Sequence, residues 1–306
     1  MDSIFVIEQL LNGLGYGLML FLLAAGLSLV FGIMDTMNLA HGSLYMAGAY
    51  LAAQAHAAGA GFATAVLAAV AVTVAIAFLL ELAIVRRLYA RDHLAQVIAT
   101  FGIILIADDV VKAIWGPSPV MAAMPAALAG PVQLLPELPY PAYRLLLIGV
   151  GLVVALGLYL LVSHTRIGML VRAGASNRGM AELMGVRVGR VFSFVFVLGA
   201  ALAALAGALM GPISAVQIGM GEAILIPALV VIVIGGIGSV RGAFVAALLV
   251  GLVDTAGRAF LPPALRAVLP PALAAELGAA LAGIAMYLLM AAVLILKPAG
   301  LFPARG

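Results

Sequence analysis

The feature that most constrains this chain is a series of apolar runs, each long enough to cross a lipid bilayer. A membrane helix needs about 20 apolar residues to span roughly 30 Å of hydrocarbon. The runs cover residues 10–31, 39–58, 63–86, 94–115, 142–163, 191–213, 222–236, 242–260 and 276–296. They predict an all-α, polytopic transmembrane helical bundle of about nine spans, and eight to ten spans are compatible with the pattern.

Composition excludes several classes of protein. With 66% hydrophobic and 9% charged residues, the chain is too apolar to close as a water-soluble globule. The basic residues are dispersed and lack interleaved aromatic residues, so we expect no nucleic-acid partner. We expect membrane lipid to surround the chain. There is no cysteine for a disulfide, a thiol nucleophile or a cysteine metal site. The first residues carry no basic segment, so the first span is expected to remain in the mature protein.

The longest polar interruption, residues 163–190, fixes the expected orientation. It holds five arginines and a single acid, Glu182. Because cytoplasmic loops carry the excess of Lys and Arg, this stretch is assigned to the cytoplasm. Alternating the spans from it places eleven basic residues inside and four outside. The N-terminus is then external and the C-terminus cytoplasmic. The inside set is Arg86, Arg87, Arg91, Arg166, Arg172, Arg178, Arg187, Arg190, Arg241, Lys297 and Arg305, and the outside set is Lys112, Arg144, Arg258 and Arg266.

The same stretch contains a short predicted helix. Ser176 or Asn177 can cap its start, and Gly185 suits the left-handed conformation at its end. Within it, Met180, Leu183 and Met184 recur at helical spacing. From the residues alone, this apolar face could meet another protein, the lipid headgroups or the bundle itself.

The remaining connections are short or rich in proline, and no separate soluble domain fits between the spans, so residues 1–306 are read as one transmembrane domain. Two external loops are expected, residues 116–141 and 261–275, because their prolines forbid a continuous helix. The runs 39–58 and 222–236 are short or polar enough to be broken or re-entrant helices.

Polar residues interrupt the apolar sequence near the second run. They are Asp35, Thr36, Asn38, His41 and Ser43. Polar groups at membrane depth are expensive unless they face a cavity or one another. If the chain breaks near Asn38 and a helix restarts near Gly42, these groups border a central pathway. The alternative is an ordinary loop in water.

A second unusual stretch is the glycine-rich segment of residues 231–244. It lacks the lysine of a phosphate-binding loop, so a tight helix reversal is expected, built on Gly235, Gly236, Gly238, Ser239 and Gly242. Isolated acids occur near predicted span ends, where solvated positions are expected; they are Glu81, Asp108, Asp109, Glu222 and Asp254. Asp108 and Asp109 are the deepest pair and could be a proton site.

Catalytic and metal-binding motifs are absent from the sequence. There is no H-E-x-x-H, no G-x-S-x-G and no spacing of the four histidines that suits a metal ion. The chain is therefore not expected to be an enzyme. Since it has no nucleotide-binding motif either, a transporter of this kind takes energy from an ion gradient or from another subunit.

At this point the sequence resembles a known family, the LivH-like permease subunits of bacterial branched-chain amino acid ABC importers. The resemblance extends over essentially the whole chain. It rests on four ordered motifs: GLSLVFGIMDTMNLAHGSLYMAGAY (26–50), RIGMLVRAGASNRGMAELMGVRVGRV (166–191), GGIGSVRGA (235–243) and LKPAGLF (296–302).

The resemblance implies an inner-membrane permease of the ABC importer fold that forms half of a pathway for aliphatic amino acids. The implied partners are a second permease, LivM-like or a second copy of this chain, two ATP-binding subunits and a periplasmic binding protein. No cofactor is expected on this chain, because ATP and Mg²⁺ would lie on the partner subunits. The family also includes permeases for urea and short amides, and an autonomous channel or ion-coupled carrier is the alternative from another class.

Two sets of residues acquire expected roles from the resemblance. The cytoplasmic loop matches the segment that docks on the ATP-binding subunits, with Arg172, Ser176, Asn177, Met180, Glu182, Leu183, Met184 and Gly185. It reads AELMG and lacks the full E-A-A-x-x-x-G pattern of other importers, so no individual contact is carried over. The family's N-x-A-H-G element matches here and, with the next residue, gives the pathway-lining or pathway-structuring set Asn38, Ala40, His41, Gly42 and Ser43.

Overall fold

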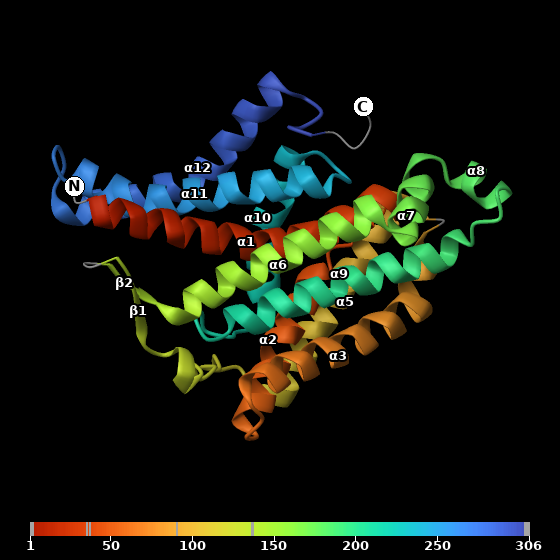
Figure 1. Ribbon diagram of the computed structural model, residues 1–306, viewed down its shortest axis with the longest axis horizontal. Coiled ribbons are helices and arrows are strands. Elements are labelled where there is room, and N and C mark those ends of the chain that lie inside the picture. Colours follow the sequence, from red (N-terminus) through yellow and green to blue (C-terminus); the bar gives the residue numbers. More distant parts are fainter. Residues whose placement is uncertain (1–2, 35, 37, 90, 136–137, 303–306) are drawn as a thin grey trace.

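The protein is an elongated bundle of helices in which the first helix runs through the centre (Figure 1). The computed structural model describes residues 3–34, 36, 38–89, 91–135 and 138–302, without the side chain of Arg178. The helices are α1 Ser3–Met34, α2 His41–Ala57, α3 Phe62–Leu80, α4 Arg86–Leu88, α5 His93–Trp115, α6 Ala142–His164, α7 Arg166–Ser176, α8 Arg178–Leu183, α9 Val188–Met210, α10 Met220–Gly235, α11 Val240–Leu265 and α12 Pro271–Leu296. A π-helical turn, Glu81–Val85, joins α3 to α4; a 3₁₀ turn, Ala126–Leu128, and two strands, β1 Pro131–Leu135 and β2 Leu138–Pro141, precede α6.

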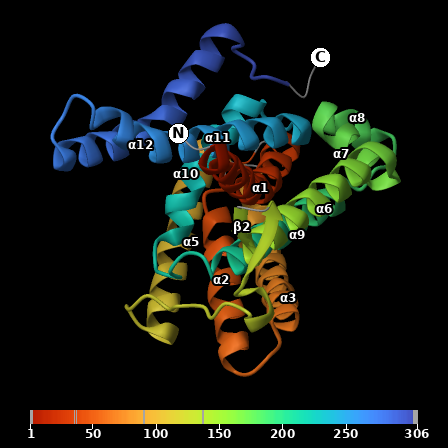
Figure 2. The ribbon, with the colours of Figure 1, turned by 60° about the vertical axis from the view of Figure 1, so that its left-hand side comes forward.

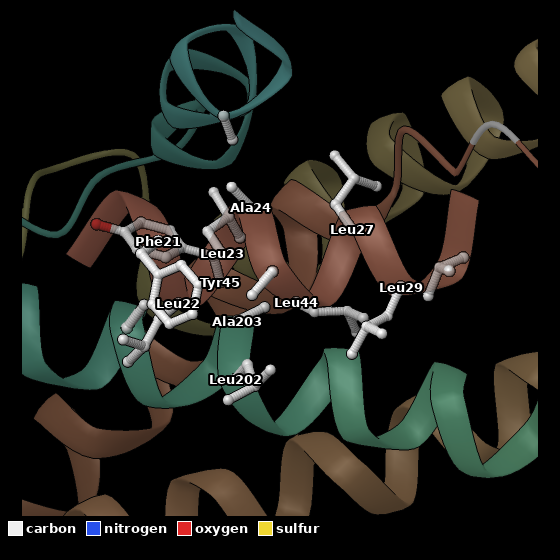
Figure 3. Packing of buried hydrophobic residues seen from close by; sticks show 14 of the residues in the cluster. Phe21, Leu22, Leu23, Ala24, Leu27, Leu29, Leu44, Tyr45, Leu202 and Ala203 are labelled. Carbon is white, nitrogen blue, oxygen red and sulfur yellow. The ribbon is translucent and has the colours of Figure 1, made fainter. Parts of the chain in front are cut away.

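The centre of the core is α1. Every residue from 18 to 25 has at most 4% of its surface exposed. A helix that is apolar on all sides is suited to such a position, because any of its faces can meet a neighbour. Helices α6, α9, α10 and α11 pack around it. Figure 3 shows Phe21, Leu22 and Leu23 of α1 beside Leu202 and Ala203 of α9 and Tyr45 of α2.

The predicted all-α membrane bundle is confirmed. Each of the nine predicted apolar runs matches one continuous helical stretch, which for residues 63–86 consists of α3, the π-helical turn and the start of α4. Within the described ranges, six helical stretches are long and apolar enough to cross a bilayer: Ser3–Met34, Phe62–Leu88, Ala142–His164, Val188–Met210, Val240–Leu265 and Pro271–Leu296. Helices α2 and α10 have 17 and 16 residues, fewer than the about 20 that a full crossing needs.

Loops gather at two opposite ends of the bundle (Figure 1). At the end that holds the N-terminus, β1 and β2 form an antiparallel hairpin in which Val132 pairs with Tyr140. Two buried tyrosines fasten this end: Tyr140 donates to Asn12 Oδ1 at 2.9 Å, and Tyr143 donates to the Leu209 carbonyl at 2.6 Å. The predicted proline-rich segment 116–141 thus holds more structure than an extended loop, although Pro136 lies outside the described residues.

The predicted second loop, residues 261–275, is shorter than expected. Helix α11 continues through Pro262 and Pro263 to Leu265, and α12 begins at Pro271. Each proline removes one backbone donor and its i→i−4 hydrogen bond, and the helix ends at Leu265, two residues after Pro263. Pro271 occupies the first position of α12, where its fixed φ favours helix initiation.

Two acids expected at solvated positions are buried and paired, so that expectation was wrong for them. Glu81 is fully buried; its carboxylate accepts hydrogen bonds from Arg86 at 3.1 and 3.2 Å and from the Tyr89 hydroxyl at 3.0 Å. Asp254 accepts from Arg258 at 2.9 Å. Both cations lie four or five residues further along the chain, close enough on a helix to reach their acid. The Tyr89 hydroxyl loses its proton less readily, because burial and the charge of Glu81 raise its pKa.

Candidate functional site

The polar segment after α1 turns back into the bundle and starts α2 there. His41, the first residue of α2, lies between two glycines: a Cβ on Gly26 of α1 would be 3.1 Å from its Nε2, and one on Gly199 of α9 would be 3.2 Å from its Cε1. Gly26 is eight residues before the end of α1, so His41 lies about two helical turns inside that end. The ring is 1% exposed.

Side chains satisfy the backbone of this returning segment. The Ala40 amide donates to Asn38 Oδ1 at 3.1 Å, and the Leu39 amide donates to the Thr100 hydroxyl of α5 at 3.3 Å. The Thr36 hydroxyl donates to the Met34 carbonyl at 2.9 Å. Non-helical backbone at membrane depth is tolerated only where other protein groups take its hydrogen bonds. Asp35 belongs to the same sequence pattern but lies outside the described residues.

Helix α10 begins inside the bundle as well, and its start touches the start of α2. A Cβ on Gly221 would lie 2.5 Å from the Gly42 carbonyl oxygen and 3.1 Å from the Ser43 nitrogen. The contact is therefore one of backbone with backbone, which only glycine permits. Two short helices thus meet by their N-termini, and from there α2 runs to one end of the bundle and α10 to the other (Figure 2).

The structure brings together the five residues of the predicted pathway set, which are Asn38, Ala40, His41, Gly42 and Ser43. They do not line an open passage in this structure. Asn38, His41 and Ser43 are 2%, 1% and 6% exposed. Asn38 Nδ2, His41 Nε2 and Ser43 Oγ have no hydrogen-bond partner among the described residues. Buried polar atoms without partners are costly, and such atoms gather at sites that change state or receive a ligand.

The predicted tight reversal joins α10 to α11. Gly236 and Gly238 have φ values of 99° and 80°, in the region that favours glycine. Ser239 caps α11 by accepting a hydrogen bond from the Gly242 amide at 3.0 Å. Gly235 and Gly242 touch backbone to backbone, since a Cβ on Gly235 would lie 2.6 Å from the Gly242 oxygen.

The expected coupling segment consists of two helices, α7 and α8. The predicted cap is Asn177, whose Oδ1 accepts from the Met180 amide at 2.9 Å, while Ser176 ends α7. At the other end, the Gly185 amide donates to Glu182 and the Val186 amide to Ala181, both at 3.0 Å, with Gly185 at φ 83°. These two bonds form a Schellman motif, so both ends of α8 are fixed locally.

The apolar residues of this segment face solvent in the isolated chain. Met180, Leu183 and Met184 are 57%, 85% and 78% exposed. They do not lie against the chain's own bundle, which removes one of the three alternatives for this face. Arg172, on α7, donates to the Val162 carbonyl at the end of α6 and so holds α7 against that helix.

A cavity of about 1880 Å³ lies at the same end of the bundle. Its wall includes the end of α1, the C-terminal half of α6, the α7 residues Arg172 and Ser176, and the reversal between α10 and α11. Arg241, which follows that reversal, lies with its guanidinium 5.2 Å from the centre of the Tyr159 ring. The cavity therefore borders both the coupling segment and the reversal.

One group of residues was not recognised as a site from the sequence. Glu222, in the first turn of α10, has both carboxylate oxygens buried and without a partner in the described part of the chain. Asp108 Oδ1 and the Tyr50 hydroxyl are also buried and have no hydrogen-bond partner among the described residues. From the sequence, only Asp108 and Asp109 were a candidate site, because of their apolar context. The group as a whole was missed because no sequence pattern indicates that α2, α5 and α10 meet.

The sequence matches the protein family described as "Branched-chain amino acid transport system / permease component" over residues 9–294. It is 28% identical to the high-affinity branched-chain amino acid transport system permease protein BraD of Pseudomonas aeruginosa, over 82% of this chain and 86% of the relative. It is 28% identical to the corresponding protein LivH of Escherichia coli K12, over 84% and 88%. A probable LivH of Methanocaldococcus jannaschii is 29% identical over 38% of this chain and 36% of the relative.

No solved structure matches the chain. The family match covers far more than half of the 306 residues, and it includes the returning segment before α2, the coupling segment and the reversal between α10 and α11. The chain therefore belongs to the family of branched-chain amino acid transport system permease components.

Proposed function

We propose that the chain is the membrane permease of an ATP-driven importer and forms half of the pathway for branched-chain and other aliphatic amino acids. The family match over residues 9–294, together with relatives named for branched-chain amino acid transport, carries this proposal. The other half of the pathway comes from a second permease, either a homologue or another copy of this chain. A periplasmic binding protein delivers the solute, and the membrane is the bacterial inner membrane.

Energy enters through two ATP-binding subunits, which bind ATP and Mg²⁺ and carry out the hydrolysis. The exposed, locally fixed face of α8 supports this role, because three large apolar side chains in water are otherwise unfavourable. Each such side chain contributes about 1.5–3 kcal/mol when it is buried against a partner. The fixed start and end of α8 reduce the entropy that is lost on docking. The pairing of Arg172 with α6 supports transmission of movement from α7 to the spans.

The pathway residues act by structuring the bundle. Asn38, Ala40 and His41 hold the start of α2 inside the bundle, and Gly42 and Ser43 place it against α10. The buried atoms of Asn38, His41 and Ser43 without partners support a junction that rearranges during transport. In membrane transporters, interrupted helices that end near the centre of the bilayer commonly form the substrate site.

Reconstitution tests the proposed function. Proteoliposomes that hold this chain, the second permease and the ATP-binding subunits should accumulate leucine, isoleucine or valine only with ATP and the loaded binding protein. Liposomes that hold the chain alone should not. Solute movement by the chain alone would indicate an autonomous channel or carrier, and accumulation of urea instead of leucine would indicate an amide permease.

Cysteine labelling tests the orientation. The chain has no native cysteine, so single cysteines report unambiguously. Ser118 and Ser176 are both exposed; Ser118 belongs to the connection from α5 to β1 and Ser176 ends α7, and β1 and α7 lie at opposite ends of the bundle (Figure 1). An impermeant thiol reagent added to spheroplasts should label Ser118→Cys and should label Ser176→Cys only after permeabilisation. The reverse pattern would show that the N-terminus and residues 116–141 are cytoplasmic.

A further inference from the structure

Helices α2 and α5 face each other along a stripe that includes both polar and apolar residues. The Leu39 amide contacts Thr100 at one end of the stripe, and the Tyr50 ring lies 5.1 Å from the Trp115 ring at the other. On α5, Thr100, Ile104 and Val111 are at most 6% exposed. Asp108 lies four residues after Ile104 and three before Val111, so it is on the same face of α5.

The facing stripe of α2 carries two hydroxyl groups. Ser43 and Tyr50 are seven residues apart and therefore share one face of the helix. They are 6% and 0% exposed, and neither hydroxyl has a hydrogen-bond partner among the described residues. The Tyr50 ring packs against Trp115 of α5, the helix that carries Asp108.

Glu222 completes the group from the first turn of α10. The preceding residue, Gly221, lies against the Ser43 backbone, so Glu222 begins α10 beside the polar stripe of α2. A first-turn acid also interacts favourably with the helix dipole. The helix dipole supplies no hydrogen bond, and both carboxylate oxygens of Glu222 have no hydrogen-bond partner among the described residues.

The contrast with the other buried acids is informative. Glu81 and Asp254 each accept hydrogen bonds from an arginine of their own segment. For Asp108 and Glu222, the described part of the chain provides no such cation. Two charged carboxylates within an apolar bundle are strongly disfavoured unless they take up a proton or meet a positive group.

The arrangement of the oxygens limits the class of cation. The described residues contain no set of three acidic or histidine side chains that could hold a metal ion. An ammonium group, with three N–H donors, can use carboxylate and hydroxyl oxygens that come from different helices. We infer that Ser43, Tyr50, Asp108 and Glu222 form a binding site for the protonated amino group of the transported solute. This inference rests on the proposed function and names how this chain recognises its solute.

The test uses the assembled transporter in proteoliposomes, with the double substitution Asp108→Asn and Glu222→Gln. The shapes of the side chains are kept and both charges are removed. Leucine uptake should fall at least about tenfold, since charge-assisted hydrogen bonds are lost. ATP hydrolysis stimulated by the loaded binding protein should stay within about twofold of wild type, because the docking surfaces are unchanged. Uptake equal to wild type would overturn the site.

Asp109→Asn is the matched control. Asp109 is the next residue on α5, but it is exposed and points away from the buried stripe. Its substitution should change uptake less than twofold. A loss as large as that of the double variant would overturn the assignment to Asp108 and Glu222. A wild-type assembly without ATP-dependent leucine uptake would instead contradict the proposed function.

Thermal stability separates recognition from a structural role. If the carboxylates have no partner within the protein, removing them relieves repulsion, and the Tm of the solubilised double variant should equal or exceed that of wild type. A Tm lowered by several degrees would show that the acids hold the fold, which would overturn the inference.

The ammonium group itself is tested with two probes, leucine and 4-methylpentanoate, which lacks the amino group. Saturation-transfer NMR on the solubilised assembly without binding protein should detect leucine with the wild type and lose that signal in the double variant. 4-Methylpentanoate should give no signal with either. Equal signals for the two probes, or leucine binding unchanged in the double variant, would contradict recognition of the amino group.

Discussion

Met184→Asp should abolish solute-stimulated ATP hydrolysis and uptake while the permease remains inserted in the membrane. Met184 is 78% exposed and follows the last residue of α8, so the substitution disturbs no contact within the chain. In the assembled transporter, the aspartate would replace an apolar side chain whose burial contributes about 1.5–3 kcal/mol. It would also bring a desolvated charge into the interface. The affinity for the ATP-binding subunits should therefore fall at least about tenfold.

The measurement is co-purification of the ATP-binding subunits, followed by ATP hydrolysis with and without loaded binding protein. Met121→Asp is the control: Met121 is 79% exposed and belongs to the connection from α5 to β1, and β1 lies at the end of the bundle opposite α8 (Figure 1). It should leave the affinity for the ATP-binding subunits unchanged. Normal stimulation in Met184→Asp, with the variant confirmed in the complex, would exclude this face as the coupling element.

Gly42→Ala should prevent the junction between α2 and α10 from forming. The added Cβ would overlap the carbonyl oxygen of Gly221, and because this atom is backbone, no side chain can move aside. Overpacking typically costs about 1–3 kcal/mol, and a clash with backbone lies at the upper end of this range. We expect a strongly lowered Tm of the detergent-solubilised protein and a low yield of monodisperse material.

The matched control is Gly102→Ala in α5. A Cβ at Gly102 would meet no atom within 4 Å. Alanine favours a helix over glycine by roughly 0.5–1 kcal/mol, so this variant should be as stable as wild type or slightly more stable. If Gly42→Ala melts at the same temperature as Gly102→Ala, the two helices do not meet as the structure describes.

The sequence by itself determined the features that depend on local chemistry. Apolar runs located the helices, because backbone groups in lipid must be satisfied within the helix. Asn177 and Gly185 marked the start and end of α8, since a cap and a Schellman motif need only neighbouring residues. The four family motifs then indicated a permease, which the family match confirmed.

Only the tertiary structure decided which residues meet. In a membrane protein, faces toward lipid and faces toward other helices are both apolar, so periodicity does not say which side of a span is buried. The sequence therefore could not show that Gly42 touches Gly221, or that His41 lies between Gly26 and Gly199. It also gave Glu81 and Glu222 the same expected position near a span end, although Glu81 has a partner from its own segment and Glu222 has none among the described residues. That difference depends on contacts between helices far apart in the chain, and local sequence carries no record of such contacts.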